Sequence, residues 1–155
     1  MNIYAYQRPI GEIQDIPALR KKFISIFETK DKIQIARFGL LYGQHILDIT
    51  DTKPNTEITL AFEAIQEWID GKVNYHKARN ISFRHLYNMD AREEKEIIEK
   101  KIYKIIGQIA SIPHVKAHGL WATDFAITLI NRMYPNNMDE VQRERLKQIE
   151  LIMNV

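Results

Sequence analysis

Isoleucine and other apolar residues recur every three or four positions along most of this chain, and this spacing constrains its fold more than any other feature. The clearest case is residues 91–112, where one face of a helix would carry Ile98, Ile102, Ile105, Ile109 and Ile112. Beyond the opening NIYAY stretch, no strand-like alternation of apolar and polar residues persists. The sequence therefore predicts an all-α fold.

Helix-capping and helix-breaking residues divide this pattern into segments. Pro17 suits the first turn of a helix that Asp15 caps, and Asp31 caps the next helix. Gly71 terminates a helix that begins at residue 56, and Asp90 caps the isoleucine-rich helix. Residues 74–88 form a less definite helix. Pro113 then separates the isoleucine-rich helix from a helix over 114–134, and a last helix covers 138–153.

These segments predict a single-domain bundle of six or seven helices over residues 1–155, with residues 1–15 compatible with an extended arm. In the second helix we expect the inward face to hold Ile35, Phe38, Tyr42, His45 and Ile49. In the last helix we expect it to hold Val141, Leu146, Ile149 and Ile152 or Met153.

The composition excludes several classes of function. No cysteine occurs among the 155 residues, so disulfides, thiol catalysis and cysteine-ligated zinc are excluded. The N-terminus lacks the basic and apolar regions of a signal peptide, and no uncharged run is long enough to span a membrane. We therefore expect a cytoplasmic protein with no membrane partner.

His114 and His118 stand four residues apart, which on a helix would place both imidazoles on one face. A metalloprotease helix reads H-E-x-x-H, but Val115 occupies the position of the glutamate here. A catalytic zinc also needs a third protein ligand, for which the candidates are Asp124, His45, His76 and His85. None of these lies at a defined spacing, so we assign no metal, no cofactor and no catalytic residue. The pair either packs structurally or lines a ligand pocket.

Asp124 is the only charged residue between Gly119 and Asn131, in a segment that is otherwise apolar on nearly all sides. A carboxylate in such a helix is costly unless it is paired or hydrogen-bonded. We expect its partner among Arg37, Arg79, Arg84 or a histidine. The pair is either a buried structural contact or part of a pocket.

The segment from Lys72 to Arg84 interleaves bases with aromatic residues, a mixture that binds single-stranded nucleic acid when it lines a groove. On one helix, however, Tyr75, Phe83 and Tyr87 would face the core while the bases face water. We therefore regard nucleic acid as the less favoured partner and keep this segment as an alternative site.

Four stretches together are similar to the immunity-five-like family of immunity proteins from bacterial polymorphic-toxin systems. They are ARFGLLYGQHIL (36–47), AFEAIQEWIDGKV (61–73), HKARNISFRHLY (76–87) and IGQIASIPHVKAHGLWATDFAITLI (106–130). The family's Trp-x-x-Gly helix ending matches Trp68 and Gly71, and its Arg–His pattern matches Arg79 and His85. Its last motif matches Gly107, Gln108, His114, His118, Gly119 and Ala122. The similarity covers about residues 35–131, but TKPNTEIT replaces the family's acidic Arg-Pro turn.

This resemblance implies an all-helical cytoplasmic protein that binds and neutralises a cognate protein toxin without catalysis. It also implies that Gly119 and Ala122 let a neighbouring helix approach while the two histidines form hydrogen bonds across the gap, and that His45 and His85 are candidates to join them. Two alternatives stay open. One is a small-molecule-binding or metal-dependent enzyme that uses His114, His118 and Asp124, and the other is a nucleic-acid-binding module.

The net charge of +2 bears on the target. Inhibitors of nucleases commonly present an acidic face that mimics nucleic acid. A mildly basic chain is therefore a poor fit for the basic cleft of a nuclease.

Overall fold

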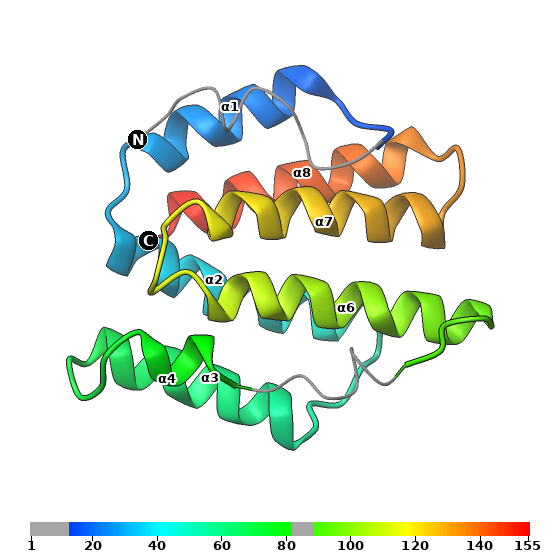
Figure 1. Cartoon of the computed structure of the whole chain (residues 1–155). Helices are drawn as coiled ribbons and strands as arrows, with labels where there is room; N and C mark the ends of the chain where they lie inside the picture. The colour runs from blue at the N-terminus through cyan, green and yellow to red at the C-terminus, as the bar shows by residue number, and fades with distance from the viewer. Residues whose placement is uncertain (1–12, 82–88) are drawn as a thin grey trace.

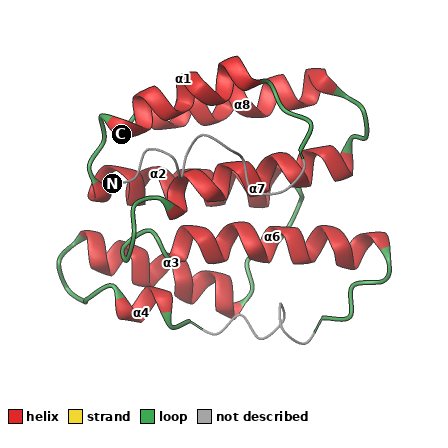
Figure 2. Ribbon diagram, turned by 45° about the horizontal axis from the view of Figure 1, so that its top comes forward, coloured by secondary structure: helices red, strands yellow, loops and turns green. Residues whose placement is uncertain are grey.

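The computed structural model describes residues 13–81 and 89–155. Every regular element in these two ranges is an α-helix, which confirms the all-α prediction (Figures 1 and 2). The helices are α1 (Pro17–Glu28), α2 (Lys32–Ile49), α3 (Thr56–Ile69), α4 (His76–Arg79), α6 (Glu94–Ala110), α7 (His118–Met133) and α8 (Met138–Met153). None of these helices is both long and apolar enough to cross a membrane.

The helices stack in layers around α7 (Figure 1). The pair α1 and α8 lies on one side of the bundle, and α3 with α4 lies on the opposite side. Between them, α7 packs along α6, and α2 contacts α3, α6, α7 and α8. Four different helices therefore surround α2, and its inward side chains link both sides of the bundle.

The core is built from the apolar faces that the periodicity predicts. Ile105 and Ile109 of α6 are buried, as is the aromatic run Phe23, Phe38 and Tyr42 of α1 and α2. The ring of Phe38 lies 5.5 Å from that of Phe23 and 5.4 Å from that of Tyr42, between centroids. Such aromatic pairs stabilise a core beyond the area they bury.

Two predicted helix boundaries are confirmed by local geometry. The side chain of Asp31 accepts a hydrogen bond from the Gln34 backbone N–H, while the Gln34 side chain accepts one from the Asp31 N–H. This reciprocal capping box satisfies two backbone donors that the start of α2 would otherwise leave free. Gly71, just after α3, has a φ of 73°, which favours glycine because it lacks a Cβ atom.

The start of α6 lies further along the chain than predicted. Its N-cap is Glu93 rather than Asp90, and the Asp90 carboxylate instead forms an exposed ion pair with Arg92 at 2.9 Å. The helix predicted over 74–88 is reduced to the four residues of α4 in the described part of the chain, and residues 82–88 lie outside it.

The junction at Pro113 also differs from the prediction. α6 ends at Ala110 and α7 begins only at His118, so His114 lies between the helices instead of on α7. Proline has no backbone N–H and disfavours helical geometry at the preceding residue, so a run of tight turns replaces the helix. One such turn is closed by the bond from the His114 N–H to the Ser111 carbonyl at 3.1 Å. The two histidines therefore do not share a helical face.

The buried face of α8 is more polar than predicted. Val141, Ile149 and Ile152 are buried as expected, but Leu146 is 45% exposed and Met153 is 63% exposed. The remaining buried positions of this helix are polar or charged, namely Glu144, Arg145 and Gln148. In α2, Ile49 is likewise exposed. The inward face of α8 is thus set by polar partners as much as by apolar area.

Candidate functional site

Five of the seven predicted site residues come together at one end of the bundle. Trp68 lies near the end of α3, Arg79 ends α4, Gln108 lies near the end of α6, His118 begins α7, and His114 lies in the junction before it. In Figure 1 this is the left end, where the α6–α7 junction passes close to α3 and α4. The fold therefore gathers motif residues that are spread over 50 positions of the sequence.

His118 joins α6 to α7. Its Nδ1 lies 2.7 Å from the Gln108 Oε1, so the protonated Nδ1 donates to the amide oxygen. The ring also meets the Trp121 ring edge-on, with centroids 4.9 Å apart. Burial lowers the pKa of His118, and the positive charges of His114 and Arg79 lower it further. This contact agrees with the predicted hydrogen bond across a helix gap.

His114 stacks on a tyrosine of the α3–α4 connection. Its ring centroid lies 4.9 Å from that of Tyr75, whose ring also meets His76 at 4.1 Å. Desolvation lowers the pKa of His114, and so do the nearby charges of Arg79, His76 and Lys32. Among the described residues, the charged groups that act on this imidazole are therefore all basic.

We call the resulting group the cationic cluster; its members are Lys32, His76, Arg79, His114 and His118. Within the described ranges, no carboxylate forms a hydrogen bond or ion pair with any of the five side chains. The nearby Glu67 is already paired with Lys77 at 2.7 Å. The Lys32 ammonium lies over the Trp68 ring instead, 5.6 Å from its centroid. The cluster thus concentrates positive charge without a matching acid.

Gly119 seats this end of α7 against α2. A Cβ added at Gly119 would lie 2.5 Å from Cγ2 of Ile35 and 3.5 Å from the Phe27 ring. Only glycine allows this separation, so the close approach that the family motif implied is present.

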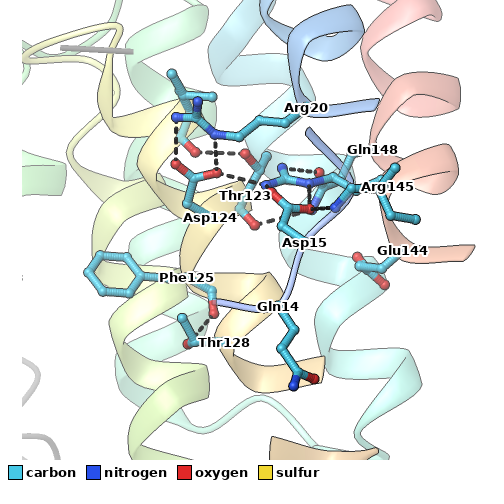
Figure 3. Close-up of polar contacts among 12 residues, drawn as sticks. Gln14, Asp15, Arg20, Thr123, Asp124, Phe125, Thr128, Glu144, Arg145 and Gln148 are labelled. Carbon is cyan, nitrogen blue, oxygen red and sulfur yellow. Dashed lines mark hydrogen bonds and ion pairs between the residues drawn. The ribbon is translucent and has the colours of Figure 1, made fainter. Parts of the chain in front are cut away.

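Asp124 belongs to a different polar region, buried between α1, α7 and α8 (Figure 3). Arg20 donates two hydrogen bonds to its carboxylate, from Nε to Oδ1 at 3.0 Å and from Nη2 to Oδ2 at 2.9 Å. Arg145 donates to the same Oδ1 at 2.9 Å and binds Asp15 through Nε and Nη2. The prediction that Arg37, Arg79, Arg84 or a histidine pairs with Asp124 is therefore wrong. We call Asp15, Arg20, Asp124 and Arg145, together with Gln148, the buried ion network.

Hydrogen bonds extend this network into α2. Gln148 accepts from Arg145 at 2.9 Å and donates to the Tyr42 hydroxyl at 2.8 Å. That hydroxyl donates to Glu144, whose carboxylate also binds His45 Nε2 at 2.9 Å. Burial raises the pKa of Tyr42 well above its usual value, and the charge of Glu144 raises it further. The phenol therefore stays protonated and acts as a donor.

His45 consequently does not join the other two histidines, contrary to the prediction. It lies 13 residues beyond Lys32 on α2, which is about 20 Å along the helix. Instead, it lines a surface hollow of 510 Å³ together with Glu144, Tyr134 and Leu146. The other histidine proposed to join them, His85, lies outside the described residues.

The trio His114, His118 and Asp124 is not assembled as the enzyme alternative requires. Asp124 is fully buried and bound by two arginines, while the two histidines contact Gln108, Tyr75 and Trp121. Among the residues that the structure describes, no group of three or more histidine, aspartate or glutamate side chains is placed to hold a metal ion. Asp124 therefore belongs to a different set of contacts from the two histidines.

The sequence pointed to most of the cationic cluster but missed the roles of Lys32 and Tyr75. Lys32 belongs to no motif that the sequence singles out, and Tyr75 was expected to face the core. Their contacts depend on how α2 and the α3–α4 connection pack against the junction. No periodicity within a single helix reports such packing.

A family model described as "Imm-5 like putative immunity protein" matches residues 25–155. The chain belongs to this family. The match extends beyond the stretch of about 35–131 that carried the resemblance, and includes α8 with Arg145 and Gln148. Comparison with characterised proteins and with solved structures finds no match. For this Imm-5 like protein, the family name therefore supports an immunity role in general.

Proposed function

We propose that this protein binds and neutralises a cognate protein toxin without catalysing a reaction. The observation that carries the proposal is the family match over residues 25–155, because it covers the end of α1 and every later helix of the described chain rather than one motif. The cationic cluster supports it, since a charged surface that lacks an internal partner suits recognition of another molecule.

Neutralisation by binding needs shape and charge complementarity rather than a set of reacting groups. The polar groups buried deepest in this bundle are already bonded to one another, with no buried side-chain nitrogen or oxygen left without a partner in the described residues. They therefore hold the scaffold, while the partly exposed cluster remains open to a partner.

The test begins with the genes beside this one in the native genome, among which a gene with a toxin domain is sought and cloned. Cells that express the toxin from an inducible promoter should survive when this chain is co-expressed, and the two proteins should co-purify. An empty vector and an Arg145→Ala chain, whose scaffold we expect to be weakened, are the controls. Cell death despite abundant folded chain would refute the proposal.

A further inference from the structure

The cationic cluster combines charge with partial exposure, and its members come from α2, α4, the α6–α7 junction and α7. Arg79 and His76 are exposed, while Lys32, His114 and His118 are each partly buried. The positive start of α7 lies at the same place, because His118 is its first residue. Among the described residues, the charges that act on the pKa values of His114 and His118 come from members of the cluster. Negative charge brought to this surface would therefore favour the protonated form of both imidazoles.

The acids at this end of the bundle are turned to other partners. Glu67 of α3 binds Lys77 of α4, and Asp31 caps α2. Glu28 and Asp31 act on Lys116, whose ammonium lies over the Phe27 ring at 4.8 Å. A partner would consequently meet the cluster without first displacing an internal carboxylate.

The aromatic rings beside the cluster are already in contact with its members. Tyr75 is in contact with His76 and His114, Trp68 lies under Lys32, and Trp121 meets His118. Single-stranded nucleic acid binds such surfaces largely by stacking its bases on open rings. Rings that already contact a lysine or histidine side chain are less available for base stacking. The surface therefore favours carboxylates, which bind lysine, arginine and protonated histidine directly.

We propose that the cationic cluster is the surface that docks the toxin, and that its occupant is an acidic segment of that protein whose carboxylates contact Arg79, Lys32 and the histidines. This inference rests on the proposed function but names the surface and the chemistry that recognises it. A nucleic acid at the same surface is the competing outcome.

The experiment uses the purified full-length chain and a hexaglutamate peptide as the probe. The peptide should shift the imidazole NMR signals of His114 and His118, and it should bind more tightly at pH 6 than at pH 8. In the described part of the chain, the charged groups that act on His114 are Lys32, His76 and Arg79, and those that act on His118 are His114 and Arg79, so protonation adds to a field that is already positive. No shift at millimolar peptide would overturn the proposal.

Two double variants that each lose two positive charges separate the effect of the cluster from that of the net charge of the protein. Arg79→Gln with Lys32→Gln should weaken peptide binding about tenfold. Lys53→Gln with Lys95→Gln removes two exposed lysines elsewhere and should change it less than about twofold. Equal losses in both variants would show that only net charge matters and would overturn the proposal. His76→Gln provides a second cluster variant if the first double variant is unstable.

A short single-stranded RNA distinguishes the competing outcome. RNA binding that is tighter than peptide binding and is lost in the Arg79→Gln, Lys32→Gln chain would assign the surface to nucleic acid. Toxin protection is measured separately in cells. If the cluster variant binds neither peptide nor toxin but the unaltered chain protects, both proposals stand. If that variant still protects fully, the docking surface is refuted while the immunity function remains.

Discussion

Two polar regions of the bundle share helix α7 but treat charge in opposite ways. At Asp124, in the buried ion network, two arginines and two aspartates balance one another at distances of 2.6 to 3.0 Å. At His118, the first residue of the same helix, the charges are all basic and no described carboxylate is bonded to them. The first region satisfies its charges inside the protein, and the second leaves them for an outside partner.

This difference separates stability from recognition. Breaking a buried ion pair leaves an uncompensated charge in a medium of low dielectric constant, whereas an exposed charge remains solvated. Substitutions in the buried ion network should therefore act on folding. Substitutions of exposed residues in the cationic cluster should act on binding and leave the fold in place.

The largest effect is expected from Arg145→Ala. It would leave Asp15 without the two bonds it receives from Arg145 and would deprive Asp124 and Gln148 of one each. We expect the free energy of unfolding to fall by about 3–5 kcal/mol, measured by urea denaturation. Arg143 lies two residues before Arg145 on α8 and forms an exposed ion pair with Glu140. Arg143→Ala should therefore cost less than about 1 kcal/mol. Similar losses in the two variants would show that buried and exposed charges of α8 contribute equally to stability.

A smaller effect is expected where α7 meets α2. Gly119→Ala places a Cβ 2.5 Å from the Ile35 methyl group and forces the helices apart. The cost should be about 1–3 kcal/mol in the same denaturation assay. Gly107→Ala on α6 is the matched control, because nothing lies within 4 Å of the added atom, and it should stabilise the helix by about 0.5–1 kcal/mol. A neutral result at Gly119 would mean that the approach of the two helices is not tight.

Removing the acceptor of His118 should have a milder consequence. Gln108→Leu leaves the Nδ1 donor without its partner across the α6–α7 gap. We expect a loss of about 1 kcal/mol, since both side chains are only partly buried and water can replace part of the bond. Calorimetric unfolding at neutral pH measures it. A loss as large as that of Arg145→Ala would show that His118 mainly stabilises the fold, as the buried ion network does.

Stability should respond to pH in two separate windows. The pKa values of His114 and His118 lie below 6.5 in the folded chain, so the unfolded chain binds more protons and stability falls as the pH drops below about 6.5. Burial opposes ionisation of Asp15, but the hydrogen bond and charge of Arg145 prevail and hold the pKa of that carboxyl below 3.8. The stability it contributes is complete above that value and is lost only as the pH falls through the lower folded pKa.

Urea midpoints collected between pH 3 and pH 8 would resolve the two windows. His118→Gln should flatten the upper window, and Asp15→Asn should remove part of the lower one. Gln108→Glu sharpens the comparison further, because a carboxylate beside Nδ1 would raise the pKa of His118 and reverse the slope that this residue contributes. An unchanged upper window in His118→Gln would show that His118 does not contribute to it.

The helices could be predicted from the sequence because each is specified locally. Apolar spacing defines α6, the Asp31 box starts α2, and Gly71 follows the end of α3. The polar inner face of α8 could not, because Glu144, Arg145 and Gln148 resemble an exposed helix surface when read alone. Their burial depends on partners such as Tyr42, which lies 106 residues away from Gln148.

The candidate site shows the same division. The family motif identified Trp68, Arg79, Gln108 and the two histidines, and packing at the α6–α7 junction brought them together. The expected helical pairing of His114 with His118 failed because Pro113 ends regular hydrogen bonding before α7 begins. Here the chemistry was readable from residue types, whereas the geometry depended on contacts between helices.

The long separation between partners in the buried ion network has a consequence for synthesis. Asp15 lies 130 residues before Arg145, and Arg20 lies 104 residues before Asp124. While the chain emerges from the ribosome, Asp15 and Arg20 stay solvated until α7 and α8 have been synthesised. We expect the nascent bundle to stay open and sensitive to proteases until α8 has emerged, and to close in a single late step.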